Sequence, residues 1–60
     1  MTRVKLDWEI DVKDAETGRI YTYTVRAHET PHSAIMRAIF IHGGSNKVEW
    51  AGNPRIYHPL

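Results

Sequence analysis

The chain of 60 residues is near the lower size limit for a protein that folds alone, because a chain this short buries only about 60% of its unfolded surface. It therefore forms one domain. A formal net charge of +1 gives no overall electrostatic reason to bind nucleic acid or an anionic membrane. The absence of cysteine excludes a disulfide and thiolate chemistry, and no apolar run reaches the roughly 18 residues of a membrane span, so we expect a cytoplasmic protein.

Two neighbouring segments predict a β-hairpin early in the chain. Apolar and charged residues alternate strictly from Val4 to Lys13, which is typical of a strand with one buried face. The small polar residues of 14–18 suit a hairpin loop in which Gly18 adopts a positive φ. Residues 19–27 are rich in threonine and tyrosine and predict the second strand.

The register of this hairpin follows from its faces, since a slip of one residue would turn every side chain of a strand over. Pairing Asp14 with Arg19 gathers the large apolar side chains on one face. The expected apolar pairs are Leu6 with Ala27, Trp8 with Val25, Ile10 with Tyr23, and Val12 with Tyr21. On the solvent-facing side the expected pairs are Asp7 with Arg26, Glu9 with Thr24, and Asp11 with Thr22.

One helix follows, with a clear signal at each end. Thr30 can accept a hydrogen bond from a free backbone amide of the first turn, and Pro31 fits the first helical position. Gly43 and Gly44 favour the end of the helix, and His42 suits the negative end of the helix dipole. The sequence therefore predicts a helix from Pro31 to His42.

A third, shorter strand is predicted over residues 47–51, where Val48 and Trp50 alternate with charged residues. Because a helix joins the second strand to the third, these two strands should be parallel, and the third can lie beside the first. The expected fold is an α+β domain of β-β-α-β order with the sheet order 2-1-3. We expect this domain to span residues 1–52 and residues 53–60 to form an extended tail.

The predicted helix is apolar on nearly its whole circumference. Its second apolar side must therefore be covered by another part of the chain, or it remains exposed and tends to bind other molecules. The stripe expected to face the sheet consists of Ala34, Ile35, Ala38, Ile39 and Ile41. Met36 and Phe40 project together from the opposite side, beside Arg37. Either the tail folds back over them, or they form a docking surface for another protein or a second copy, or the helix itself is wrongly assigned. The tail residues that could cover them are Pro54, Ile56, Tyr57 and Leu60.

The second predicted strand contains a window from Ile20 to Val25 without charge or proline, and such an edge invites pairing with another strand. The residues that would contact a partner protein there are Tyr21, Thr22, Tyr23 and Thr24. Alternatively, Arg19 and Arg26 prevent pairing as flanking charges, or the tail pairs with this edge.

No group of residues in the sequence predicts catalysis or a cofactor. The four histidines lack the spacing of established zinc sites. The carboxylates of Asp7, Glu9 and Asp11 line one strand face, but this face is an open sheet surface with lysine and arginine nearby. We therefore expect no enzymatic activity, no metal site, no cofactor and no small-molecule substrate.

The expected function is a small interaction module that binds another protein or a second copy of itself, as a regulator, an inhibitor or a homo-oligomeric accessory protein. It would act through Met36, Arg37 and Phe40, through residues 21–24, or through both. The alternative is nucleic-acid binding by basic and aromatic residues near the helix end and the tail. Those residues are Arg3, Arg37, Lys47, Arg55 and Tyr57.

Overall fold

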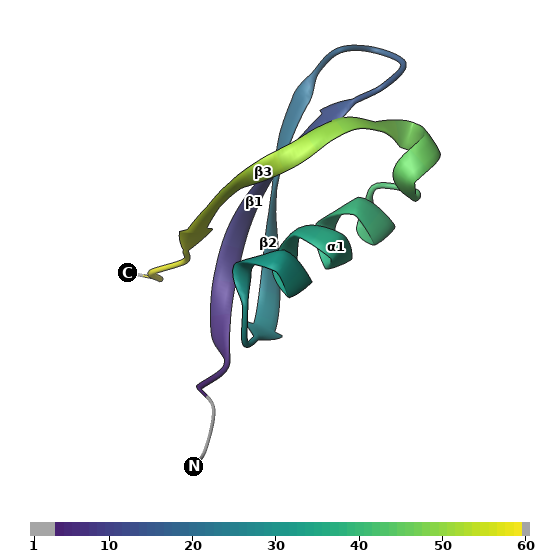
Figure 1. The fold of residues 1–60 in the computed structure, drawn as a ribbon. Helices are drawn as coiled ribbons and strands as arrows, with labels where there is room; N and C mark the ends of the chain where they lie inside the picture. The colour runs from purple at the N-terminus through teal and green to yellow at the C-terminus, as the bar shows by residue number, and fades with distance from the viewer. Residues whose placement is uncertain (1–3, 60) are drawn as a thin grey trace.

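The computed structural model describes residues 4–59, which form a three-stranded sheet with one helix packed on it (Figure 1). The elements in chain order are β1 (Leu6–Asp14), β2 (Ile20–His28), α1 (Pro31–Ile41), the short 3-10 helix η1 (Ser45–Lys47) and β3 (Val48–Ile56). Both β2 and β3 pair with β1 in the antiparallel sense, in the order β2-β1-β3. The predicted β-β-α-β fold and its sheet order 2-1-3 are therefore confirmed.

The hairpin between β1 and β2 closes as the sequence predicts. The Asp14 N–H donates to the Arg19 carbonyl oxygen at 2.8 Å, and Gly18 adopts a φ of 74° in the loop. On the face toward the helix, the confirmed pairs are Trp8 with Val25, Ile10 with Tyr23, and Val12 with Tyr21. On the other face they are Glu9 with Thr24 and Asp11 with Thr22.

A bulge in β2 changes the pairing at the open end of the hairpin. Leu6 lies opposite His28, so the expected pair of Leu6 with Ala27 is wrong. Ala27 has a φ of 62°, and its N–H donates to Oδ1 of Asp7 at 3.1 Å. The Asp7 carboxylate, expected opposite Arg26, therefore binds the backbone of the bulge. Alternation of residue types does not reveal such an inserted residue.

The helix α1 has the predicted signals at both ends. Oγ1 of Thr30 accepts a hydrogen bond from a first-turn N–H at 3.1 Å, and Pro31 is the first helical residue. After the last turn the backbone leaves the helix, with φ values of 117° at Gly43 and 102° at Gly44. The helix ends one residue before the predicted end, and His42 is its C-terminal cap.

The core lies between the helix and one face of the sheet, and it is small. Its buried residues are Ile10, Val12, Val25, Ala34 and Ala38. Half-buried side chains packed around them are Trp8, Tyr23, Ile35, Val48 and Ala51. The prediction that Ile41 faces the sheet is wrong, because its side chain is 47% exposed. Viewed down the helix axis, Ile41 lies at the edge of the buried stripe, on the side of Ala34 that is opposite to Ala38.

Strand β3 is longer than the strand predicted over residues 47–51, because it continues as far as Ile56 through the segment expected to be a tail. The expected domain boundary at residue 52 falls inside this strand. Ile56 lies opposite Trp8, and a bulge at Asn53, with a φ of 53°, adjusts the register against β1. The tail segment is therefore part of the sheet up to Ile56.

A second shift of register in β3 separates Val48 from Trp50. Trp50 lies opposite Lys13, whose neighbour Val12 is buried under the helix, so Trp50 faces away from α1. Val48 and Ala51 pack against the core instead. The predicted alternation, with Val48 and Trp50 on the same face, is thus interrupted by a bulge.

Candidate functional site

The residues of α1 that the sequence singles out are exposed. The side chain of Met36 is 53% exposed and that of Phe40 is 68% exposed, and both lie about half a turn from the buried alanines of the helix. The Arg37 guanidinium carbon lies 5.2 Å from the centre of the Phe40 ring, a cation–π distance. We call Met36, Arg37 and Phe40 the helix face. It combines an apolar centre with one adjacent positive charge.

The tail that could have covered the helix face lies against β1 instead. Residues up to Ile56 belong to β3, and the Tyr57 N–H continues the pairing by donating to the Asp7 carbonyl oxygen at 2.8 Å. Leu60 lies outside the described residues. Within residues 4–59, therefore, the tail leaves the helix face open.

The outer edge of β2 is the second open surface. Along an antiparallel strand, residues that bond to the neighbouring strand alternate with residues whose N–H and C=O groups point away from it. The hydrogen bond from Asp14 to Arg19 shows that Arg19 is one of the residues of the first kind. They are the odd-numbered residues of 19–25. The N–H and C=O groups of Ile20, Thr22 and Thr24 consequently point away from the sheet. We call these three residues the β2 edge.

The two edges of the sheet differ in their protection against pairing. In β3, Pro54 and the bulge at Asn53 interrupt the row of backbone donors, which is a common protection of edge strands. The β2 edge has no such interruption before the bulge at Ala27, although Arg19 and Arg26 flank it. The alternative in which the tail pairs with β2 is wrong, since the described tail pairs with β1.

The edge residues of β2 differ in how far they are free to contact a partner. Thr22 and Thr24 are exposed, although the Thr22 hydroxyl donates to Oδ1 of Asp11 at 2.9 Å. Tyr21 is 40% exposed, whereas Tyr23 is half-buried against the core. Three of the four predicted contact residues are thus accessible.

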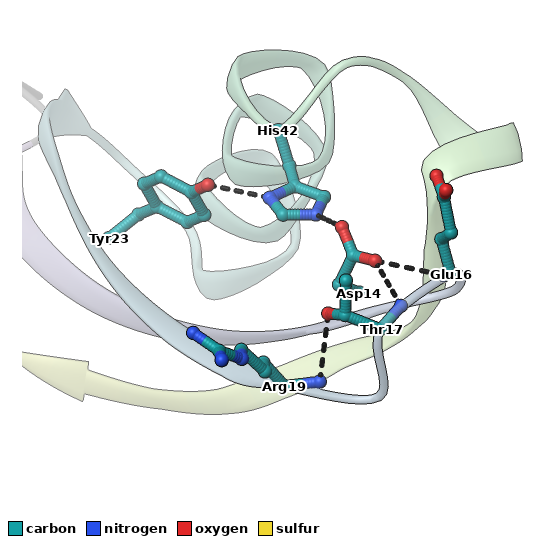
Figure 2. A network of polar contacts seen from close by, with 6 residues as sticks. All are labelled: Asp14, Glu16, Thr17, Arg19, Tyr23 and His42. Carbon is teal, nitrogen blue, oxygen red and sulfur yellow. Dashed lines mark hydrogen bonds and ion pairs between the residues drawn. The ribbon is translucent and has the colours of Figure 1, made fainter.

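A polar network joins the ends of β1 and α1 to β2, and sequence reasoning missed it (Figure 2). Nδ1 of His42 lies 2.6 Å from the Tyr23 hydroxyl, and its Nε2 lies 2.7 Å from Oδ2 of Asp14. The His42 side chain is only 7% exposed, and the ring of Tyr21 packs against it with centroids 5.4 Å apart. The available signal was a histidine directly before two glycines, but the sequence does not show that the helix ends over the hairpin.

Asp14 belongs both to this network and to the hairpin loop. Its Oδ1 accepts the N–H groups of Glu16 and Thr17, each at 2.8 Å (Figure 2). The hydrogen bond from Thr17, followed by that with His42, lowers the pKa of Asp14 from its ordinary value of 3.8 to about 2. The ionised carboxylate therefore fastens the loop to the end of α1. No cavity opens beside it in the described part of the chain.

On the face of the sheet turned away from α1, Asp11 of β1 has a basic partner in Arg55. Nη2 of Arg55 lies 3.0 Å from Oδ1 of Asp11, and Nη1 lies 3.2 Å from Oδ2. The hydrogen bonds from Arg55, and after them those from Asn53 and Thr22, lower the pKa of Asp11 from 3.8 to about 2. Lys13 pairs with Glu49 at 3.0 Å. On this face, therefore, Arg55 neutralises Asp11 and Lys13 neutralises Glu49.

The residues of the nucleic-acid alternative do not form one patch. Arg37 belongs to α1 on one side of the sheet, whereas Arg55 is held in its ion pair on the other side. Lys47 lies in η1, and Tyr57 is half-buried after β3. Arg3 lies outside the described residues.

Neither a metal centre nor a membrane-spanning helix is found within residues 4–59. No three histidine, aspartate or glutamate side chains converge on a possible metal position there, and neither helix of that range is long and apolar enough to cross a bilayer. No protein-family model, no curated protein and no solved structure matches this chain.

Proposed function

We propose that this chain is a small, non-enzymatic protein-interaction module that acts as a regulator, an inhibitor or a homo-oligomeric accessory protein. The observation that carries the proposal is the course of residues 48–57, which pair with β1. Within residues 4–59, no other segment covers the helix face or pairs with the β2 edge. An exposed apolar helix face and an unpaired strand edge are two features through which small domains bind proteins.

The chemistry of the helix face supports this proposal. Methionine, phenylalanine and arginine are enriched at the centres of protein interfaces, where lysine and glutamate are depleted. Because Met36 is 53% exposed and Phe40 68% exposed, a partner that buries them fully would gain about 1–2 kcal/mol from each. Arg37 supplies a donor for a carboxylate or a carbonyl oxygen at the rim of such a contact.

Nucleic-acid binding has less support. Arg55 is already paired with Asp11, and the carboxylates beside it would repel a phosphate backbone. If the chain did bind nucleic acid, it would shift an oligonucleotide in a gel, and the affinity would fall steeply with added salt.

The test of the helix face is a variant carrying Met36→Asp and Phe40→Asp. Its matched control is Val4→Asp, because Val4 is 69% exposed, as Phe40 is, but lies outside the helix. Solution mass and the proteins retained from an extract of the native host are compared among the wild type and both variants. We expect the double variant to stay folded by circular dichroism and to lose binding at least about tenfold, while the control binds as the wild type does. Unchanged binding in a folded double variant would remove the helix face from the proposal.

A further inference from the structure

We infer that the β2 edge is the contact between two copies of this chain, which join their three-stranded sheets edge to edge into one continuous antiparallel sheet. The inference rests on the proposed function and deepens it by naming the occupant of one of its two surfaces. The helix face is left open for a different protein.

The outward backbone groups fix the register of this contact. Ile20, Thr22 and Thr24 present N–H and C=O groups at every second position, and the strand is interrupted beyond them by the bulge at Ala27. A two-fold axis at Thr22 sets Thr22 opposite the partner's Thr22 and Ile20 opposite the partner's Thr24. All three residues then exchange backbone hydrogen bonds, so every outward donor and acceptor of the β2 edge is satisfied.

The side chains of β2 agree with the same register. On the face toward the helices, Tyr21 lies opposite the partner's Tyr23, and such cross-strand aromatic pairs stabilise sheets. In the single chain Tyr21 is 40% exposed and Ile20 is 58% exposed. The contact covers both, which explains why large apolar side chains stand at an otherwise solvated edge.

The charges next to the β2 edge do not oppose the contact. No charged residue occurs within 20–25, and the flanking Arg19 lies opposite the partner's Val25, so arginines do not face each other. Arg26 lies opposite the partner's Gly18, beside a loop whose exposed carboxylate is the partner's Glu16. At each end of the paired strands, Arg19 of one copy and the partner's Arg26 therefore lie at neighbouring positions but on opposite faces of the sheet.

The size of the core favours a second copy over an unrelated strand. Only five residues are buried in the hydrophobic core of residues 4–59, and domains of this size commonly depend on oligomerisation for added stability. A second copy of the chain is always present at the same concentration as the first. It carries an uncharged strand whose outward N–H and C=O groups match those of the first copy.

Thr24→Pro tests the contact, because proline removes the outward N–H of Thr24 and leaves the hydrogen bonds between β2 and β1 in place. Thr24→Val is the matched control, since valine keeps both the N–H and the branched shape. The solution mass is measured by light scattering over a range of concentrations. We expect the wild type and Thr24→Val to reach twice the chain mass of 6.9 kDa, and a folded Thr24→Pro to remain at 6.9 kDa.

A single cysteine tests the register independently, and it also covers the case in which Thr24→Pro does not fold. The chain has no cysteine of its own. In the inferred register Thr22 and the partner's Thr22 have Cα atoms about 5.5 Å apart, within disulfide range, whereas Thr24 lies more than about 13 Å from the partner's Thr24. We expect Thr22→Cys to form a covalent dimer under mild oxidation at least tenfold faster than Thr24→Cys.

The possible outcomes separate this inference from the proposed function. A dimer that survives Thr24→Pro but is lost with Met36→Asp and Phe40→Asp would overturn the β2 contact and leave the interaction module standing. A wild type that stays at the chain mass at every concentration would overturn the second copy as the partner. Faster crosslinking of Thr24→Cys than of Thr22→Cys would overturn the register. If the wild type stays monomeric and the helix-face variant also changes no binding, both proposals fail.

Discussion

At the scale of single residues, His42 holds together segments that are far apart in the sequence. Its ring lies between Tyr23 and Asp14, and Asp14 in turn holds the loop through the N–H groups of Glu16 and Thr17. In a domain with so few buried apolar residues, a satisfied polar network of this kind carries a larger share of the stability. It also orients Tyr21 and Tyr23, the aromatic residues of β2.

Removal of the Tyr23 hydroxyl measures the contribution of one bond of this network, the bond to His42. Tyr23→Phe leaves a ring nitrogen of the nearly buried His42 without its partner, and we expect it to lower the free energy of unfolding by about 1 kcal/mol. Tyr21→Phe is the control, because the Tyr21 hydroxyl makes no hydrogen bond within residues 4–59. Urea unfolding followed by tryptophan fluorescence gives both values. Equal effects of the two substitutions would show that the hydrogen bond between Tyr23 and His42 contributes nothing measurable.

The two carboxylates with lowered pKa values predict an acid-sensitive fold. The pKa values of Asp11 and Asp14 are about 2 in the folded chain, against 3.8 ordinarily. A lowered folded-state pKa gives stability that is fully present above about pH 4 and is lost as the pH falls toward 2. We expect the urea midpoint of the wild type to fall over this interval. The variant with Asp11→Asn and Asp14→Asn should be less stable at pH 7 and show a flatter decline; an equally steep decline would contradict the assignment.

At the scale of the elements, the end of α1 depends on glycine. Gly44 has a φ of 102°, and an added Cβ there would meet no atom within 4 Å, so Gly44→Ala tests backbone strain alone. We expect it to cost about 1 kcal/mol or more in unfolding free energy. Gly52→Ala is the control, because Gly52 has an ordinary φ and equally open surroundings. If both variants were as stable as the wild type, the left-handed helix end would not be required.

Those elements whose signals are local could be predicted from the sequence. The alternation in β1, the loop glycine at Gly18, the cap at Thr30 and the two glycines after the helix each act within a few residues. The three bulges could not be predicted, since an inserted residue is required only by the course of the neighbouring strand. Strand β3 was predicted too short for the same reason, because Asn53 and Pro54 are typical of a strand end until a bulge accommodates them.

For the two candidate surfaces, the sequence predicted which residues form them but not whether another segment covers them. Helical spacing identified Met36 and Phe40, and composition identified the β2 edge, because both are properties of one element. Whether the tail covered either surface depended on packing between distant segments, which one sequence does not show. The network around His42 was missed for the same reason.

At the scale of the whole molecule, the segment expected to be a tail completes the sheet. Residues beyond Gly52 supply the Arg55 ion pair with Asp11, the contact of Ile56 opposite Trp8 and a backbone hydrogen bond from Tyr57. We expect a chain ending at Gly52 to lose at least about 2 kcal/mol of stability, or about 10 °C in Tm, whereas a chain ending at His58 should melt as the full chain does. A chain ending at Gly52 with an unchanged Tm would show that the segment is dispensable.

Hydrogen exchange along β2, followed by NMR at increasing protein concentration, tests most directly whether the open edge is an interface. The amides of Tyr21 and Tyr23 bond to β1 and serve as internal controls, because they should be protected at every concentration. We expect the outward amides of Thr22 and Thr24 to exchange rapidly in dilute solution and to become protected as the concentration rises. If they exchanged at the unprotected rate at every concentration while Tyr21 and Tyr23 stayed protected, the β2 edge would not be a contact between copies of this chain.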